Sequence, residues 1–287
     1  MVEWLLEPLG FAFMQRGFLA AVVVGVVCAL VGCYMILRGM AFLGDALGHA
    51  TLPGLAMGYL LSNGDRSATF FWALGTAVFT SIVMGALSRN TKLRHDTAIG
   101  IVFAGMFALG IAIISSVRSY AVDLTHMLFG NILGVTAGDL WLVLAVSLAV
   151  LLAILLFYKE LLVVSFDPVL AVTLRLPVRA LDILLHVMIA VAIVASLQTV
   201  GIALVVAMLV TPAATAFLLT KRFKRMMVLA AGIAAFSGVA GLYASYYLSI
   251  ASGATIVLVC TLVFVLVYLL RGLLRPARRI ETKSPAL

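Results

Sequence analysis

Charged residues are scarce in this chain of 287 residues, because only 10% of them are Asp, Glu, Lys or Arg and only 11 are acidic. Soluble domains carry about 25% charged residues, so this composition excludes a chain that folds wholly in water. Hydrophobic residues are correspondingly abundant at 65%, and the mean hydropathy is +1.25. The composition predicts a polytopic membrane protein.

Several motifs of catalytic proteins are also missing. The chain has no GxxxxGK[ST] loop, so we do not expect it to bind ATP and energise transport by itself. It has no HExxH zinc-protease motif and no GxSxG nucleophile turn, which argues against an intramembrane hydrolase. We therefore predict that the chain is not an enzyme.

Cysteine is rare as well. Cys28, Cys33 and Cys260 all lie within apolar runs, without the spacing of a metal finger or of a disulfide framework. We expect them to be small packing residues.

Nine apolar segments approach the ~20 residues that a spanning helix needs. They cover residues 18–37, 42–61, 68–87, 97–117, 138–157, 180–200, 201–220, 226–248 and 254–271. We predict an all-α transmembrane bundle of about eight to nine spans, forming one domain over residues 1–287. Segment 42–61 leaves the number open, because it also fits a broken or re-entrant helix.

The net charge of +8 is a topology signal. Of the 19 Lys and Arg residues, 16 fall in five groups that alternate with weakly charged turns, as the positive-inside rule requires. The groups are Arg38 and the Lys and Arg residues of 89–94, 159–179, 221–225 and 271–283. This pattern places the tail 272–287 in the cytoplasm and residues 1–17 in an external or interfacial segment. It indicates contact with lipid and not with nucleic acid.

Asp45 and His49 stand out within an otherwise apolar or small stretch, residues 40–61. An aspartate near mid-membrane costs about 2.5–3.5 kcal/mol on insertion scales, so it is rare unless it is paired, hydrated or bound to an ion. The i, i+4 spacing puts both side chains on one helix face. A carboxylate oxygen with an imidazole nitrogen suits a divalent transition metal such as Mn, Fe or Zn. The alternative is a structural pair that neutralises itself in a helix interface.

The same stretch contains features that allow close packing and a kink. Gly44 with Gly48, and Gly54 with Gly58, form two GxxxG steps, which let helices approach closely in lipid. Pro53 lacks the N–H that would bond to the carbonyl of His49. We therefore expect a loose backbone oxygen beside the two side chains, or an ordinary kink.

Pro212 marks a second interrupted helix in segment 201–220. It deprives the Met208 carbonyl of its helical donor, with the Thr211 and Thr215 hydroxyls nearby. The helix could flex along a transport pathway, or it could be a kinked packing helix.

Residues 158–182 form a loop that the charge pattern places in the cytoplasm. Asp167 followed by Pro168 is a typical helix start, with Asp as N-cap and Pro at the first helical position. We predict a short amphipathic helix over Val169–Leu176, outside the bilayer. It could dock on a cytoplasmic motor or serve as a plain surface connector.

The chain resembles a known family at six places. They are GCYMILRGMAFLGDALGHATLPG at 32–54, TAIGIVFAGMFALG at 97–110, VDLTHMLFGNILG at 122–134, FDPVLA at 166–171, VGIALVVAMLVTPAATA at 200–216 and SGATIV at 252–257. These stretches resemble the permease subunits of bacterial manganese, zinc and iron ABC importers, and they occur in the family's order along most of the chain.

The resemblance implies a fold of the type II ABC importer kind and a homodimer in the bacterial cell membrane. It also implies two cytoplasmic ATP-binding subunits and an extracytoplasmic protein that delivers the metal. No permanently bound cofactor is implied, because the divalent metal is the cargo. Asp45 and His49 match the metal-contacting pair, and Asp167–Leu176 matches the coupling helix, with Asp167, Pro168, Leu170 and Ala171 as the expected contacts.

The sequence departs from the family at two places. Leu174 and Arg175 occupy a region where the family usually has a glycine, and residues 249–251 replace an Asp-Thr-Pro type of sequence. An autonomous ion-coupled metal transporter or channel is the alternative function. The loop 167–176 distinguishes the two, because only an importer subunit needs a partner there.

Overall fold

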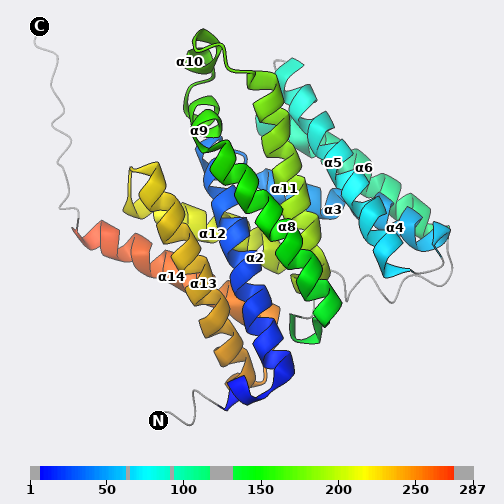
Figure 1. Ribbon diagram of the computed structural model, residues 1–287, viewed down its shortest axis with the longest axis vertical. Coiled ribbons are helices and arrows are strands. Elements are labelled where there is room, and N and C mark those ends of the chain that lie inside the picture. Colours follow the sequence, from blue (N-terminus) through cyan, green and yellow to red (C-terminus); the bar gives the residue numbers. More distant parts are fainter. Residues whose placement is uncertain (1–6, 63–64, 91–93, 117–131, 275–287) are drawn as a thin grey trace, which may run out of the picture.

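The computed structural model describes residues 7–62, 65–90, 94–116 and 132–274. All regular elements in these ranges are helical, and the longer helices are packed together as one bundle (Figure 1). They are η1 (Pro8–Gly10), α2 (Ala12–Leu37), α3 (Phe42–Ala50), α4 (Leu52–Leu61), α5 (Arg66–Asn90), α6 (His95–Ser115), η2 (Ile132–Gly134), α8 (Ala137–Leu156), α9 (Tyr158–Phe166), α10 (Pro168–Thr173), α11 (Val178–Val200), α12 (Ile202–Leu219), α13 (Phe223–Leu248) and α14 (Ser252–Leu274).

Eight of these helices, within the described residues, are long and apolar enough to cross a membrane. They are α2, α5, α6, α8, α11, α12, α13 and α14, and they match eight of the nine predicted segments. The first helix begins at Ala12, six residues before the predicted start at residue 18. Arg16 does not stop it, because its side chain is exposed near the helix end and long cationic side chains can reach the interface.

The ninth segment, 42–61, is a broken helix, which is one of the alternatives to a single span that its sequence leaves open. It consists of α3 and α4, with the break at Thr51. The Thr51 hydroxyl donates to the carbonyl of Gly48 at 2.6 Å, and Pro53 lies in the first turn of α4, where its missing N–H is tolerated. With this segment, the bundle has the predicted eight to nine spans.

Helix α2 forms the centre of the core and packs against α8, α11, α12 and α13. Tyr34 and Met35 near its C-terminal end are fully buried. Helices associate in lipid through van der Waals packing, so small residues at their contacts bring the backbones together. Gly32 is the extreme case, because a Cβ there would overlap the carbonyl oxygen of Leu209 on α12 and lie 2.8 Å from its carbonyl carbon.

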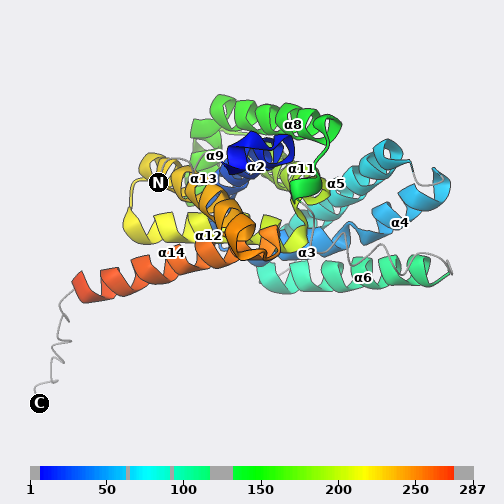
Figure 2. The same cartoon turned by 90° about the horizontal axis from the view of Figure 1, so that it is seen from below.

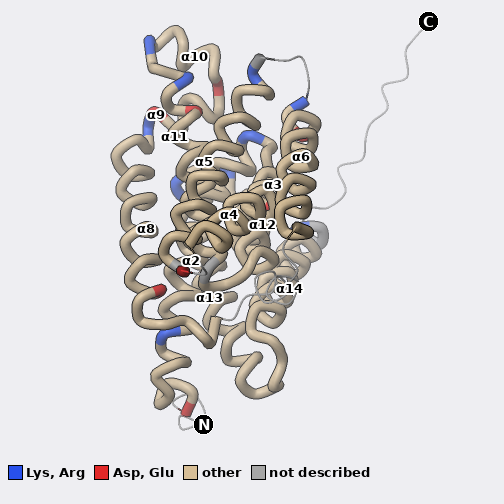
Figure 3. Tube along the Cα trace, turned by 90° about the vertical axis from the view of Figure 1, so that its right-hand side faces the viewer, with Lys and Arg blue, Asp and Glu red and all other residues tan. Residues whose placement is uncertain are grey.

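The basic turns gather at one end of the bundle, called here the basic end: the C-termini of α2 and α5, the α9–α10 segment and the α12–α13 turn. Arg38 after α2 bonds to Ser165 on α9, and the ring of Phe223 at the start of α13 packs edge-on against Tyr34. Figure 3 shows Lys and Arg concentrated toward the end that carries α10. The grouping predicted from charge is thus present in the fold.

The α2–α12 contact yields a stability prediction. Gly32→Ala should destabilise the bundle by about 1–3 kcal/mol, because the added methyl meets backbone that cannot rotate away. Gly105→Ala on α6 is the matched control, since no atom lies within 4 Å of a Cβ built there and alanine is the better helix former. Thermal unfolding in detergent should show a lower midpoint for the first variant only. An equal midpoint for both would contradict the close contact.

Candidate functional site

Helix α3 presents Asp45 and His49 toward each other. Asp45 lies in its first turn and His49 in its last, and 3.7 Å separates His49 Nε2 from Asp45 Oδ1. The carboxylate side chain is 43% exposed and the imidazole 25% exposed. The pair is therefore accessible from outside the chain and does not close on itself through a short hydrogen bond.

Helix α6 supplies an aromatic wall on the other side of His49. The rings of Phe103 and Phe107 stack on each other, and Phe107 meets the imidazole edge-on with centroids 5.8 Å apart. His49 Nδ1 is buried there without a hydrogen-bond partner among the described residues. An unsatisfied buried polar atom costs about 1–3 kcal/mol, so this placement is not explained by stability. Sequence reasoning missed both phenylalanines, because nothing separates them from the rest of an apolar run.

The two glycine steps pack as predicted, each against a different neighbour. A Cβ on Gly48 would lie 2.9 Å from Ile202 Cγ2 of α12, whereas one on Gly58 would lie 2.7 Å from the Cα of Thr69 on α5. Helix α6 covers the break itself, since a Cβ on Gly110 would lie 2.7 Å from the Cβ of Leu52. The segment is held on three sides, which fixes the position of the Asp45–His49 pair.

The two prolines behave differently from each other. Pro53 follows the break and has no N–H for the His49 carbonyl, toward which the N–H of Thr51 points at the end of α3. Helix α12 continues through Pro212. There the Thr215 hydroxyl donates to the Thr211 carbonyl at 2.7 Å and not to that of Met208.

One chain offers an incomplete metal site. Within the described ranges, no cluster of three or more His, Cys, Asp or Glu side chains could hold a metal ion. Transition metals in proteins take four or more ligands, and Asp45 with His49 supplies two. Figure 2 shows α3 beside α6, and the 43% exposure of Asp45 lets further ligands approach from outside the chain.

The predicted helix start at Asp167 is present. The Asp167 carboxylate accepts the backbone N–H groups of Val169 and Leu170 at 2.9 and 3.0 Å, and Pro168 is the first residue of α10. The helix ends at Thr173, earlier than the predicted Leu176. Arg175 has a positive φ of 57°, and the N–H of Leu176 bonds to the carbonyl of Ala171 at 3.0 Å. This left-handed turn is where a glycine is favoured, which explains the family's usual residue.

Helix α10 exposes apolar side chains. Ala171 alone is buried, while Val169, Leu170 and Val172 are 74%, 48% and 64% exposed. Phe166 just before the helix is also exposed. Contiguous exposed apolar groups mark an interaction surface, and the basic end is the part of this chain expected to face water.

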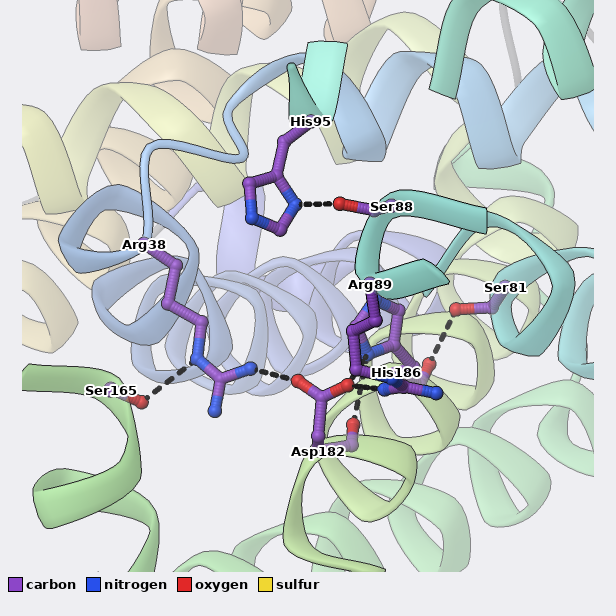
Figure 4. Close-up of polar contacts among 8 residues, drawn as sticks. All are labelled: Arg38, Ser81, Ser88, Arg89, His95, Ser165, Asp182 and His186. Atoms are coloured by element: carbon purple, nitrogen blue, oxygen red, sulfur yellow. Dashed lines mark hydrogen bonds and ion pairs between the residues drawn. The ribbon is translucent and has the colours of Figure 1, made fainter. Parts of the chain in front are cut away.

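A buried polar cluster lies beside this surface (Figure 4). Asp182 on α11 pairs with both Arg38 after α2 and Arg89 on α5. Arg38 Nε also donates to the Ser165 hydroxyl on α9 at 3.1 Å, and His186 Nδ1 lies 2.8 Å from the Asp182 carbonyl oxygen. The Asp182 carboxylate links α11 to α5 and to the end of α2, and Arg38 extends the cluster to α9.

The cluster is charged as well as buried. Asp182 and Arg38 are 13% and 11% exposed, and burying an ion costs several kcal/mol that pairing only partly offsets. Burial lowers the pKa of Arg38 to about 10, so it stays protonated at neutral pH. Its Nη2 atom is buried without a partner among the described residues. Asp182 lies near the end of a span but turns inward, because two guanidinium groups meet it there.

The remaining sequence predictions fall into two groups. The three cysteines are buried and free, as expected of packing residues. His126 and most of the stretch 122–134 lie outside the described residues, as do residues 1–6 and 275–287.

Comparison with known proteins supports one assignment. The sequence matches the ABC 3 transport family over residues 10–271. It is 46% identical to the manganese transport system membrane protein MntC of Halalkalibacterium halodurans, covering 91% of this chain and 88% of the relative. It is 38% identical to the chelated iron transport system membrane protein YfeD of Yersinia pestis, covering 90% of this chain and 86% of the relative.

A solved structure agrees with the sequence matches. The structure of PsaBC from Streptococcus pneumoniae in complex with Fab superposes with a TM-score of 0.80 and 39% identity, covering 93% of this chain and 95% of the other. Fold and sequence therefore point to the same relatives along nearly the whole chain. The chain belongs to the ABC 3 transport family, which confirms the resemblance to permeases of manganese, zinc and iron importers.

Proposed function

We propose that this chain is the membrane-spanning permease subunit of an ATP-driven importer of a divalent transition metal. The observation that carries the proposal is the Asp45–His49 pair. It places a carboxylate oxygen and an imidazole nitrogen 3.7 Å apart on an otherwise apolar or small helix. Ionisable residues at membrane depth mark ion pathways, and the relatives are named for manganese and iron transport.

The incomplete ligand set supports a homodimer. A two-fold axis beside α3 would bring together two Asp45 and two His49 side chains, giving four ligands where one chain has two. The 43% exposure of Asp45 leaves it open to such a partner. Manganese, zinc and iron all accept these ligands, so the proposal covers the three metals as a class.

The basic end supports the placement of the other partners. By the positive-inside rule it faces the cytoplasm, where the exposed apolar side chains of α10 would dock on an ATP-binding subunit, one for each permease. An extracytoplasmic metal-binding protein would deliver the ion at the opposite end. The chain would then lie in the bacterial cytoplasmic membrane with its C-terminus inside.

Asp45→Asn and His49→Ala should each lower metal uptake by at least about 100-fold. In a homodimer, each change removes two of the four proposed ligands. Losing only a residue that hydrogen-bonds to a metal ligand lowers metal affinity or activity about 10–100-fold. Uptake of radioactive manganese by cells that express the complete transporter would measure this.

Asp65→Asn is the control for that experiment. Asp65 is also a carboxylate in the membrane domain, but its hydrogen bonds go to the backbone N–H groups of Ser67 and Ala68 at the start of α5. Membrane insertion of every variant is checked by immunoblotting. Normal uptake by either ligand variant would show that the pair is structural.

Pro53→Ala tests whether the break in segment 42–61 serves transport. Alanine can donate to the His49 carbonyl and favours one continuous helix, which would displace His49 relative to α6. We expect uptake at limiting metal to fall about tenfold although both ligands remain. Pro212→Ala in α12, which is not interrupted at its proline, gives the comparison. Unchanged uptake by Pro53→Ala would show that the proline serves packing and not transport.

Asp167→Ala combined with Leu170→Glu tests the docking helix. The first change removes a cap worth about 0.5–2 kcal/mol, and the second puts a charge on the apolar surface. Metal-stimulated ATP hydrolysis by the reconstituted complex should be lost, while the permease still retains metal. Equal stimulation would exclude α10 as the coupling element, and uptake into liposomes without an ATP-binding subunit would favour an autonomous transporter.

A further inference from the structure

The Asp182 cluster lies between the two parts of the chain that an importer has to coordinate. On one side, α11 follows α10 through the short turn at Leu174–Pro177, and Asp182 lies in the second turn of α11. On the other side, Arg38 ends α2 and precedes Gly39, whose φ is +67°. Helix α3 with its metal-ligand pair begins three residues further on, at Phe42.

The connections on the docking side are short and direct. The N–H of Val178 bonds to the carbonyl of Leu176 at 2.8 Å, and the N–H of Leu181 bonds to that of Pro177 at 3.0 Å. Helix α10 packs against α9 and α11, and α9 carries the hydroxyl that receives Arg38 Nε. A displacement of α10 therefore reaches Arg38 by two routes, through Asp182 and through Ser165.

The connection on the metal side includes a pivot. Gly39 adopts a left-handed backbone conformation that other residues avoid, and residues 38–41 connect α2 to α3 along the chain. The guanidinium of Arg38 is held by Asp182 and Ser165. A displacement of this guanidinium therefore moves the backbone at the start of residues 38–41. The cluster joins the docking helix and the ligand helix across the interior of the fold.

The charged side chains of the cluster can exchange their hydrogen-bond partners. One carboxylate serves two guanidinium groups, and Arg38 Nη2 has no acceptor among the described residues. A guanidinium has five N–H donors in a rigid fork, so a rotation can exchange its acceptors without releasing the charge into lipid. Buried ion pairs add little net stability over apolar packing, and stability alone does not account for this one.

We propose that Asp182, acting through Arg38, is a positioning residue that links the position of α10 to that of the metal-binding helix α3. The inference rests on the proposed function, since it assumes an ATP-binding partner at α10 and metal at Asp45 and His49. It adds a residue to that function, because Asp182 touches neither the metal ligands nor the docking surface. Its loss should separate ATP hydrolysis from transport while leaving metal binding in place.

The test uses the complete transporter in liposomes, with Asp182→Asn as the main variant. Asparagine keeps the size of the side chain and removes the charge that holds both arginines. Basal ATP hydrolysis and the manganese retained by the permease should stay within about twofold. Metal-stimulated hydrolysis and ATP-dependent uptake should fall about tenfold, inside the usual range for coupling between protein sites.

Two further variants separate positioning from general support. Asp139→Asn removes a carboxylate from the capping box at the start of α8, at the end of the bundle opposite the basic end, and should leave coupling intact. Arg38→Lys keeps the charge, but one ammonium cannot replace the guanidinium fork toward both Asp182 and Ser165. It should reduce coupling even if Asp182→Asn does not insert.

Three results would overturn the inference. Normal coupling in Asp182→Asn, or in Arg38→Lys where the first variant does not insert, would show that the cluster transmits nothing. A parallel fall in metal retention, thermal midpoint and coupling would show a purely structural role. Equal uncoupling by Asp139→Asn would show that any weakened helix has this effect. The wild-type complex is assayed first, because a lack of ATP-dependent uptake there would refute the proposed function and not this inference.

Discussion

Hydrocarbon offers no hydrogen bonds, and this constraint determines the architecture of the chain. Each backbone group left unpaired at membrane depth costs several kcal/mol, so every element of the described ranges is a helix and the single break in segment 42–61 is enclosed. Thr51 donates its hydroxyl to the carbonyl of Gly48 before the break. Gly110 of α6 lets a neighbouring backbone cover it. An interrupted helix persists here because its surroundings replace the missing bonds.

Close helix packing serves the candidate site as much as the core. The glycine steps of α3 and α4 press against α12 and α5, while α6 brings two phenylalanines onto His49. These contacts hold the Asp45–His49 pair firmly within one chain but leave it with only two ligands. A rigid half-site agrees with a pathway formed between two copies, because ligands positioned this well need only symmetry to complete a coordination sphere.

Charge has two separate uses in this protein. The distribution of Lys and Arg residues at the basic end indicates how the chain is oriented in the membrane. The buried pairing of Asp182 with Arg38 and Arg89 joins α11 to the end of α2 and to α5. Both uses occur at the same end of the bundle, next to the exposed apolar residues of α10. The topology signal, the proposed docking helix and the proposed coupling cluster are therefore concentrated in one region.

The sequence alone determined the class of protein, the approximate positions of the spans, the Asp45–His49 spacing and the Asp167 cap, because each is a local pattern. Runs of about 20 apolar residues, an i, i+4 spacing and an Asp-Pro step need no knowledge of neighbours. Only the tertiary structure decided which residues surround these features. Phe103 and Phe107 are two of many apolar residues until α6 packs on α3, and Asp182 resembles an interfacial residue until α2 and α5 bring their arginines to it. Long-range contacts leave no local signature, since lipid-facing and protein-facing surfaces of a transmembrane helix are equally apolar.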